Sequence, residues 1–251
     1  MDIATITILV VSGLLVGFIN TLAGGGTIIS MTIFMSLGLP PMIANGTNRI
    51  PIVLQNLVAV VNYSKSKILN IKTSLKYALP VALGSILGSN IALNISDIVF
   101  NYLFIMVIVF MIIMIVFKPK LWLNENPIKK NSPFSISQWI ILFVIGIYGG
   151  FIHVGIGYFI IALIVLARGY DLLHANAIKN LVVLIYAPIS LIPFILYGNI
   201  RYDYGLVHAI GNIIGAYVAS RLATLFGSKV IRYILIAFML LSCFQVIRML
   251  S

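Results

Sequence analysis

Residues 20–27 read Asn-Thr-Leu-Ala-Gly-Gly-Gly-Thr, and they interrupt an apolar segment that would otherwise continue as one membrane helix. Each glycine lowers helix stability by about 1 kcal/mol relative to alanine and leaves backbone N–H and C=O groups uncovered. Such groups cost several kcal/mol each in hydrocarbon, so the break must be buried in protein or line a wet cavity. Transporters use broken helices to present N–H donors and a positive dipole end to an anion near the membrane midplane. The alternative is a glycine-rich packing point between helices.

The composition is that of a helical membrane protein with several spans. Of the 251 residues, 61% are hydrophobic and 8% are charged, and the mean hydropathy is +1.14. A water-exposed surface could not be built from such a chain. The net charge of +11 would suggest a nucleic-acid partner in a soluble protein, but here the lysines gather between apolar runs, as in cytoplasmic loops. We therefore expect a multi-pass protein of the cell membrane, with the lipid bilayer and no nucleic acid as partner.

The first residues of the chain and its single cysteine add to this expectation. Residues 1–7 contain no Lys or Arg, so no cleaved signal peptide is predicted and the first helix is retained. The single cysteine, Cys243, excludes an intrachain disulfide and a thiolate metal cluster.

The apolar runs follow the same order twice, because each half begins with a broken helix and continues with three full-length spans. The first half covers residues 1–118, with the broken helix at 3–38 and helices at 42–63, 74–94 and 98–117. A basic cytoplasmic linker covers residues 119–136. The second half covers residues 137–251, with the broken helix at 137–168 and helices at 174–197, 203–224 and 229–249. The sequence separation between Gly24 and Gly155, which we call the repeat offset, also relates other glycines, alanines and asparagines of the two halves, such as Asn45 and Asn176. We expect an all-α membrane protein made of two tandem pseudo-symmetric repeats.

The distribution of basic residues favours inverted repeats. If both broken helices are re-entrant, thirteen of the sixteen Lys and Arg residues lie in the cytoplasm; if each broken helix crosses once, ten do. The positive-inside rule favours the first arrangement, which inverts the second copy and places both chain ends outside.

The second break, at residues 149–157, lies opposite the first in the repeat and contains His153. We expect this histidine to bind an anion or carry a proton, or else to be satisfied by a backbone carbonyl. After each break we expect a short polar loop, at 44–49 and at 175–180, which brings Arg49 or Lys179 close to a helix N-terminus. Fixed positive charge and several N–H donors suit an oxyanion, although both cations could instead snorkel to the membrane interface. The expected substrate-binding residues are Asn20, Thr21, Gly24, Gly25, Gly26, Asn45, Thr47, Asn48, Arg49, His153, Gly155, Gly157, Asn176, Lys179 and Asn180.

Other polar and small residues have simpler interpretations. Gln55, Asn56 and Asn62 continue a polar stripe that lines a pathway or makes hydrogen bonds between helices. Small residues recur every fourth position and predict close helix packing; they are Gly84, Gly88, Ala92, Gly211, Gly215 and Ala219.

The sequence contains no cluster of His, Cys, Asp and Glu with metal-ligand spacing, no paired carboxylates and no Ser-His-Asp arrangement. We therefore expect no enzyme, no metal and no cofactor. The five acids fall in predicted loops or helix ends, which argues against a proton relay through buried carboxylates.

The first break, with Gly38-Leu39-Pro40 and residues 44–48 after it, resembles the TauE/SafE family of sulfite exporters and related anion permeases, and a weaker copy follows from Gly146 to Asn180. The resemblance covers essentially the whole chain. It implies a secondary transporter, usually an exporter, of small sulfur-containing anions such as sulfite or organosulfonates across the plasma membrane. The second copy departs from the family at Ala177-Ile178, where the first copy has Gly46-Thr47.

Together these features predict a repeat-built carrier with an anion site between the two breaks. An anion channel, or a non-catalytic membrane subunit of a larger complex, is the alternative. A coupling ion, either proton or sodium, and assembly into a homo-oligomer are compatible with the sequence, which specifies neither.

Overall fold

The computed structural model describes residues 1–100, 102–103, 105–106 and 134–226. The predicted helix at 229–249, most of the predicted helix at 98–117, most of the linker and Cys243 lie outside these residues.

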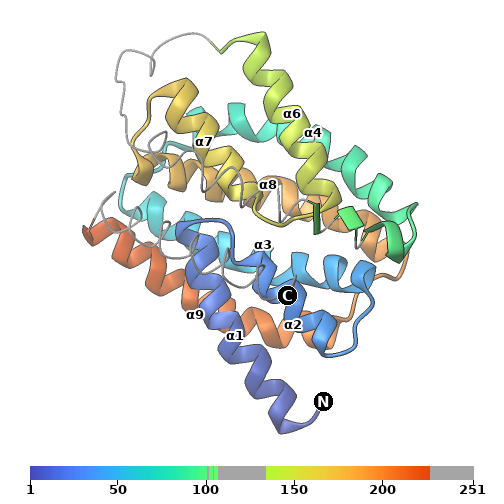
Figure 1. The fold of residues 1–251 in the computed structure, drawn as a ribbon. Coiled ribbons are helices and arrows are strands. Elements are labelled where there is room, and N and C mark those ends of the chain that lie inside the picture. Colours follow the sequence, from blue (N-terminus) through green and yellow to red (C-terminus); the bar gives the residue numbers. More distant parts are fainter. Residues whose placement is uncertain (101, 104, 107–133, 227–251) are drawn as a thin grey trace.

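Within the described residues, every regular element is a helix (Figure 1). The helices are α1 (Ile3–Leu22), α2 (Thr27–Ser36), α3 (Pro41–Lys65), α4 (Ile71–Leu93), α6 (Ile136–Phe151), α7 (Ile156–Arg168), α8 (Leu172–Leu196) and α9 (Tyr202–Phe226). Their ends lie close to those of the apolar runs, so the all-α prediction is confirmed for this part of the chain. One local prediction is wrong: residues 44–49 and 175–180 are not loops, because they form the first turns of α3 and α8.

Side chains that satisfy free backbone N–H groups fix where several helices begin. The Asn70 side chain accepts a hydrogen bond from Thr73 N at 3.1 Å and starts α4. Asp171 does the same for α8, accepting from His174 N at 3.0 Å. Burial of the Asp171 carboxylate raises its pKa, but the hydrogen bonds from the His174 side chain and N–H outweigh burial and lower this pKa to about 2. Ser135 opens α6 with a capping box.

The helices pack so that each half of the chain is covered by the other half. α1 lies along α9 and α6 lies along α4, while α3 and α8 run through the middle and contact each other (Figure 1). The predicted close packing of small residues is confirmed at both outer pairs. A Cβ added at Gly88 of α4 would lie 1.9 Å from Ile147 O of α6, and one added at Gly215 of α9 would lie 2.1 Å from Leu14 O of α1.

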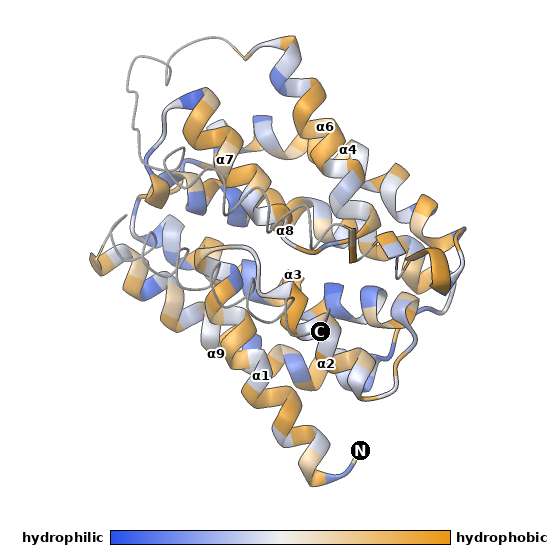
Figure 2. Cartoon of the chain, viewed as in Figure 1, coloured by the Kyte–Doolittle hydropathy of each residue, from blue (hydrophilic) through white to orange (hydrophobic). Residues whose placement is uncertain are grey.

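The polarity of the molecule is reversed relative to a water-soluble protein. α1 and α6 are coloured largely hydrophobic in Figure 2, and large apolar side chains such as Val11, Leu79 and Ile140 are exposed. In contrast Asn48, Arg49 and Asn180 of the central helices are fully buried. α1, α8 and α9 are long and apolar enough to cross a membrane, whereas the polar residues of α3 lower its hydropathy. Exposed apolar faces around a polar interior indicate a membrane protein.

Candidate functional site

The two breaks meet at the centre of the helix bundle. Gly24 has φ +85°, a left-handed conformation that favours glycine, and it lies directly against Gly157. A Cβ added at either residue would lie 2.5 Å from the Cα of the other. The glycines therefore allow the breaks of α1–α2 and α6–α7 to touch backbone to backbone.

A small cavity lies at this contact, and it is lined by Asn20, Gly24, Thr27, Gln55, Asn56, His153, Ile156, Gly157, Lys179 and Val183. Its free volume is about 10 Å³, which is room for about one water molecule. The structure is therefore closed around this point, and an oxyanion can enter only after the walls separate.

Two helix N-termini form part of the cavity wall. α2 begins at Thr27 and α7 at Ile156, and neither helix has a side-chain cap. The first N–H groups of a helix have no partner within the helix, and the N-terminus carries a partial positive charge. An anion between the two breaks would face both of these positive helix ends.

Lys179 reaches this site from α8 and contacts the end of α1. Its Nζ donates to Asn20 O at 2.6 Å, Thr21 O at 3.0 Å and Asn180 Oδ1 at 3.3 Å. The two carbonyls belong to the last turn of α1, where the helix dipole is negative. Lys179 of the second half thus places its positive charge against the negative end of α1 in the first half.

Arg49 makes the reciprocal contact from α3. Its guanidinium donates to Gly150 O at 2.6 Å, Gly149 O at 3.5 Å and Ser190 Oγ at 2.6 Å, and it lies 4.5 Å from the centroid of the Phe194 ring. The two carbonyls belong to the last turn of α6. The Arg49 Nε is buried and has no hydrogen-bond partner. Neither cation snorkels to the interface, because both side chains are buried at the centre of the protein.

No carboxylate compensates these two charges within the described part of the chain. The carboxylate contacts found there are of Asp171 with His174 and of Asp203 with Arg201, both at helix ends. A buried charge without a counterion is costly, and helix carbonyls supply only partial negative charge. The site is therefore electropositive and suits an anionic ligand.

His153 is paired with a phenol and not with a backbone carbonyl. Its Nδ1 lies 2.8 Å from Tyr186 Oη, and the two rings stack with centroids 5.3 Å apart. His153 lines the cavity and lies within electrostatic reach of both Arg49 and Lys179.

Of the expected binding residues, the cavity wall includes Asn20, Gly24, His153, Gly157 and Lys179. Asn20 offers a buried Nδ2 that has no hydrogen-bond partner.

The remaining expected residues lie around the site in other roles. Gly25 packs on the Tyr158 ring, Gly26 lies against Asn20, and Gly155 starts α7 at φ +68°. Asn45 donates to Phe151 O, Asn176 to Tyr63 Oη and Asn180 to Thr21 O. Thr47 accepts from Arg201 N, away from the cavity, while the Asn48 amide and the Thr21 hydroxyl are buried without partners.

Sequence reasoning missed Tyr186 and Ser190, which contact His153 and Arg49. Both residues sit inside an apolar run without any motif. One signal was present for Tyr186, because the repeat offset relates it to Gln55, another residue of the cavity wall.

The exposed apolar faces, the broken helices and the buried cationic centre define a helical membrane protein of the transporter class. Residues 9–246 match the family model described as sulfite exporter TauE/SafE, and the chain belongs to this family. It is 26% identical over 228 residues to a probable membrane transporter protein, ORF9, of Sinorhizobium sp., covering 91% of this chain and 87% of the relative. It is also 26% identical over 234 residues to a probable membrane transporter protein of Haemophilus influenzae, covering 92% and 91%. The probable membrane transporter protein YfcA of Escherichia coli K12 is 24% identical over 220 residues, covering 87% and 81%. No solved structure matches the chain.

Proposed function

We propose that this protein is a secondary carrier that exports small sulfur-containing anions, such as sulfite or organosulfonates, across the cell membrane. One observation carries the proposal: Arg49 and Lys179 are both buried, and Lys179 lines a cavity that has two helix N-termini in its wall, with no carboxylate counterion in the described part of the chain. A small oxyanion supplies the missing negative charge and accepts hydrogen bonds from N–H groups at the two helix N-termini. The family match supports the sulfur-anion substrate and the direction of export.

The proposed carrier is built from two repeats, and the backbone supports this division. The repeat offset relates the first residues of α3 and α8, the last residues of the same two helices, and the first residues of α4 and α9. Among the described residues, those with positive φ form three pairs with this offset: Gly24 with Gly155, Gly38 with Gly169, and Lys67 with Gly198. A shared register of unusual backbone conformations is hard to obtain without a repeated unit.

The contacts between halves support an inverted arrangement. α1 of the first half packs on α9 of the second, and α6 of the second half packs on α4 of the first. In Figure 1, α1 rises from the lower edge toward the middle, whereas α6 descends from the upper edge. Inverted repeats of this kind place the substrate site at their interface, near the membrane midplane.

The closed cavity fits a carrier that exposes its site alternately to the two sides. Counterflow in proteoliposomes tests this mechanism, because internal substrate accelerates uptake of labelled substrate in a carrier and not in an open pore. Vesicles containing only this protein are loaded with sulfite or sulfoacetate and given the labelled anion outside. Imposed proton or sodium gradients then identify a coupling ion.

The expected result is saturable counterflow that is lost in Arg49→Gln and in Lys179→Gln. Lys76→Gln is the matched control, because Lys76 is exposed on α4, away from the cavity wall. Conductance without counterflow would indicate a channel, and counterflow unchanged in both cation variants would remove Arg49 and Lys179 from the site.

A further inference from the structure

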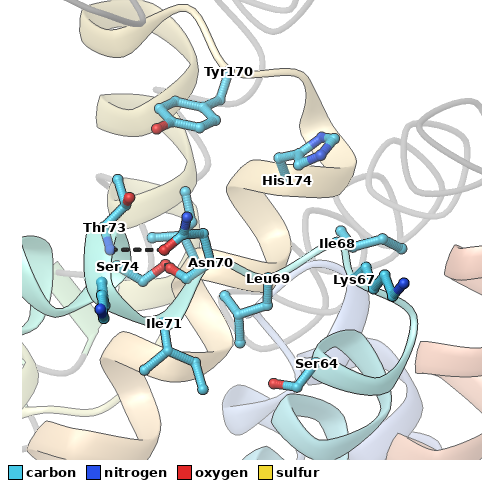
Figure 3. Close-up of a pocket in the computed structure, with 12 residues that line it drawn as sticks. Ser64, Lys67, Ile68, Leu69, Asn70, Ile71, Thr73, Ser74, Tyr170 and His174 are labelled. Carbon is cyan, nitrogen blue, oxygen red and sulfur yellow. Dashed lines mark hydrogen bonds between the residues drawn. The ribbon is translucent and has the colours of Figure 1, made fainter.

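A pocket of about 660 Å³ lies between the α3–α4 connection and the first turns of α8 (Figure 3). Leu69 and Asn70 lie on one side of it, and Tyr170 and His174 on the other. Sites for small molecules have volumes of about 300–1,000 Å³, so the pocket has room for a ligand of that size. Residues of both predicted halves of the chain line it.

The wall of this pocket is positively charged. Lys67 and Lys72 line it and are exposed, and no Asp or Glu is among the described residues of the wall. The Asp171 carboxylate lies next to Tyr170 in the sequence, but it is held by His174, whose Nδ1 is 2.5 Å from Asp171 Oδ2. A ligand that complements the wall therefore carries negative charge.

Hydrogen-bond donors accompany the two lysines. The first N–H groups of a helix have no partner within the helix, and at the start of α4 Thr73 N donates to Asn70 Oδ1 at 3.1 Å (Figure 3). The N–H groups of Ile71 and Lys72, which also line the pocket, remain for a ligand. The Ser64 hydroxyl, which is buried without a hydrogen-bond partner, lies in the wall as well. Such donors at a positive helix end suit a phosphate group.

Ile71 joins the pocket to the lipid-facing side of α4. It lines the pocket and is 48% exposed. From this residue a stripe of apolar side chains, each about half exposed, follows α4 at every fourth position and comprises Leu75, Leu79, Leu83 and Leu87. Side chains four residues apart lie on the same face of a helix, and an exposed apolar face of a membrane protein contacts acyl chains. A phospholipid can therefore contact the polar pocket and this stripe together, whereas free phosphate cannot.

The repeated fold does not account for the charge of the pocket. Lys67 has φ +56° and Gly198, which the repeat offset relates to it, has φ +69°. Glycine adopts this left-handed conformation freely, whereas lysine seldom does. The same offset relates Lys72 to Asp203, which is paired with Arg201 at 2.8 Å. The backbone of the connection is therefore formed in the second copy without a lysine at either position.

The lysines of this connection also mark the cytoplasmic side of the membrane, but that role requires no pocket. Lys65 and Lys76 are exposed in the same region and are not in the pocket wall. All four lysines serve the positive-inside rule equally, whereas Lys67 and Lys72 alone among them line the pocket. Comparison of the two pairs therefore separates a ligand site from a signal of orientation.

We propose that this pocket binds the headgroup of an anionic phospholipid of the cytoplasmic leaflet. Lys67, Lys72 and the first N–H groups of α4 hold the phosphate, and an acyl chain lies along the apolar stripe from Ile71 to Leu87. Basic pockets between membrane helices on the cytoplasmic side are suited to such headgroups. The lipid connects the first half of the chain to α8, the helix that carries Lys179. The proposal depends on the membrane class of the protein and not on the substrate proposed above.

Lipid binding is measured on the purified full-length protein in a neutral detergent, after removal of co-purified lipid. Phosphatidylglycerol is titrated, and the rise in Tm gives an apparent affinity. Phosphatidylcholine with the same acyl chains tests the need for net negative charge, and glycerol 3-phosphate tests the need for acyl chains. The wild type is expected to be stabilised by phosphatidylglycerol and by neither control ligand at the same concentration.

Lys67→Gln/Lys72→Gln is expected to bind phosphatidylglycerol about thirtyfold more weakly, because each basic residue beside an anionic headgroup contributes about fivefold. Lys65→Gln/Lys76→Gln removes the same charge outside the pocket and is expected to titrate like the wild type. Lys67→Gly separates binding from folding. Its lipid-free Tm is expected to be at least that of the wild type, since glycine suits the left-handed backbone, while its affinity for the lipid falls about fivefold.

Equal weakening by the two double variants would mean that the lysines act through general surface charge, and would overturn the site. Equal stabilisation by glycerol 3-phosphate would replace the lipid by a soluble phosphate ligand, and equal stabilisation by phosphatidylcholine would reject the role of net charge. No rise in Tm with phosphatidylglycerol would also overturn the proposal. Because none of these measurements involves transport, the lipid site and the proposed carrier can fail independently.

Discussion

Removal of the Lys179 charge is the sharpest perturbation of the central site. Lys179→Met keeps the length of the side chain and removes the cation of the cavity wall, while Arg49 stays buried at the end of α6. A unit charge pair about 4 Å apart is worth about 4 kcal/mol at the effective dielectric constant typical of proteins. Since each 1.4 kcal/mol changes an equilibrium constant about tenfold, the variant should bind a monovalent oxyanion about a thousandfold more weakly.

Thermal unfolding in detergent measures this loss. An anion present at about a hundred times its Kd stabilises the native protein by about 2.7 kcal/mol. For a chain of this size, that corresponds to a rise in Tm of about 5–10 °C. At the same sulfite concentration Lys179→Met should show no rise above its own anion-free Tm, whereas Lys76→Met should rise like the wild type.

Comparison with each variant's own anion-free Tm separates binding from folding, because Lys179→Met also loses the hydrogen bonds to Asn20 O and Thr21 O. Arg49→Gln provides a second variant if the first is poorly folded. A full anion-induced rise in Lys179→Met would refute the charge argument.

Three further predictions concern the scaffold. Gly24→Ala should prevent the two breaks from touching and destabilise the protein by several kcal/mol, because the added Cβ overpacks the contact and alanine disfavours this φ. Gly38→Ala is the comparison: Gly38 has φ +89° but open space around it, so this variant should lose only about 1–3 kcal/mol of stability. Gly88→Ala should separate α4 from α6 and cost about 1–3 kcal/mol, as measured by thermal unfolding. Asp171→Asn should remove the part of the pH dependence that arises from the lowered pKa of Asp171: the wild-type stabilisation is present above about pH 4 and is lost as the pH falls toward about 2, whereas the variant should lack this component.

A different result would contradict each of these three predictions. Equal destabilisation by Gly24→Ala and Gly38→Ala would mean that the contact between breaks is unimportant. A Gly88→Ala protein as stable as the wild type would show that α4 and α6 can separate freely. A difference between wild type and Asp171→Asn that is constant from about pH 5 to about pH 2 would exclude the carboxylate as its source.

The helices could be predicted from the sequence because long apolar runs and glycine breaks mark them locally. The first turns of α3 and α8 could not, since Gly46 and the asparagines there resemble turn residues. Two of their side chains donate hydrogen bonds to other elements: Asn45 Nδ2 to Phe151 O and Asn176 Nδ2 to Tyr63 Oη. Tertiary contacts of this kind override local preference, and no local pattern announces them.

The candidate site was predictable as a region and not in its contacts. The breaks indicated where backbone groups must be covered, and Arg49 and Lys179 were identified as the charges nearby. That each cation contacts the broken helix of the other half depends on how α3 and α8 cross. The pairing of His153 with Tyr186 depends on how α8 packs against the second break.

Localisation of a bound anion tests the account most directly. Selenite has the shape and charge of sulfite, and selenium scatters anomalously, so crystals grown with selenite and a sulfate control would place the anion without reference to the protein density. The account predicts a peak between the two breaks, within hydrogen-bond distance of Lys179 Nζ and the Asn20 side chain, with the cavity wider than in the closed structure. A selenite peak that lies elsewhere and leaves the breaks in contact would contradict it.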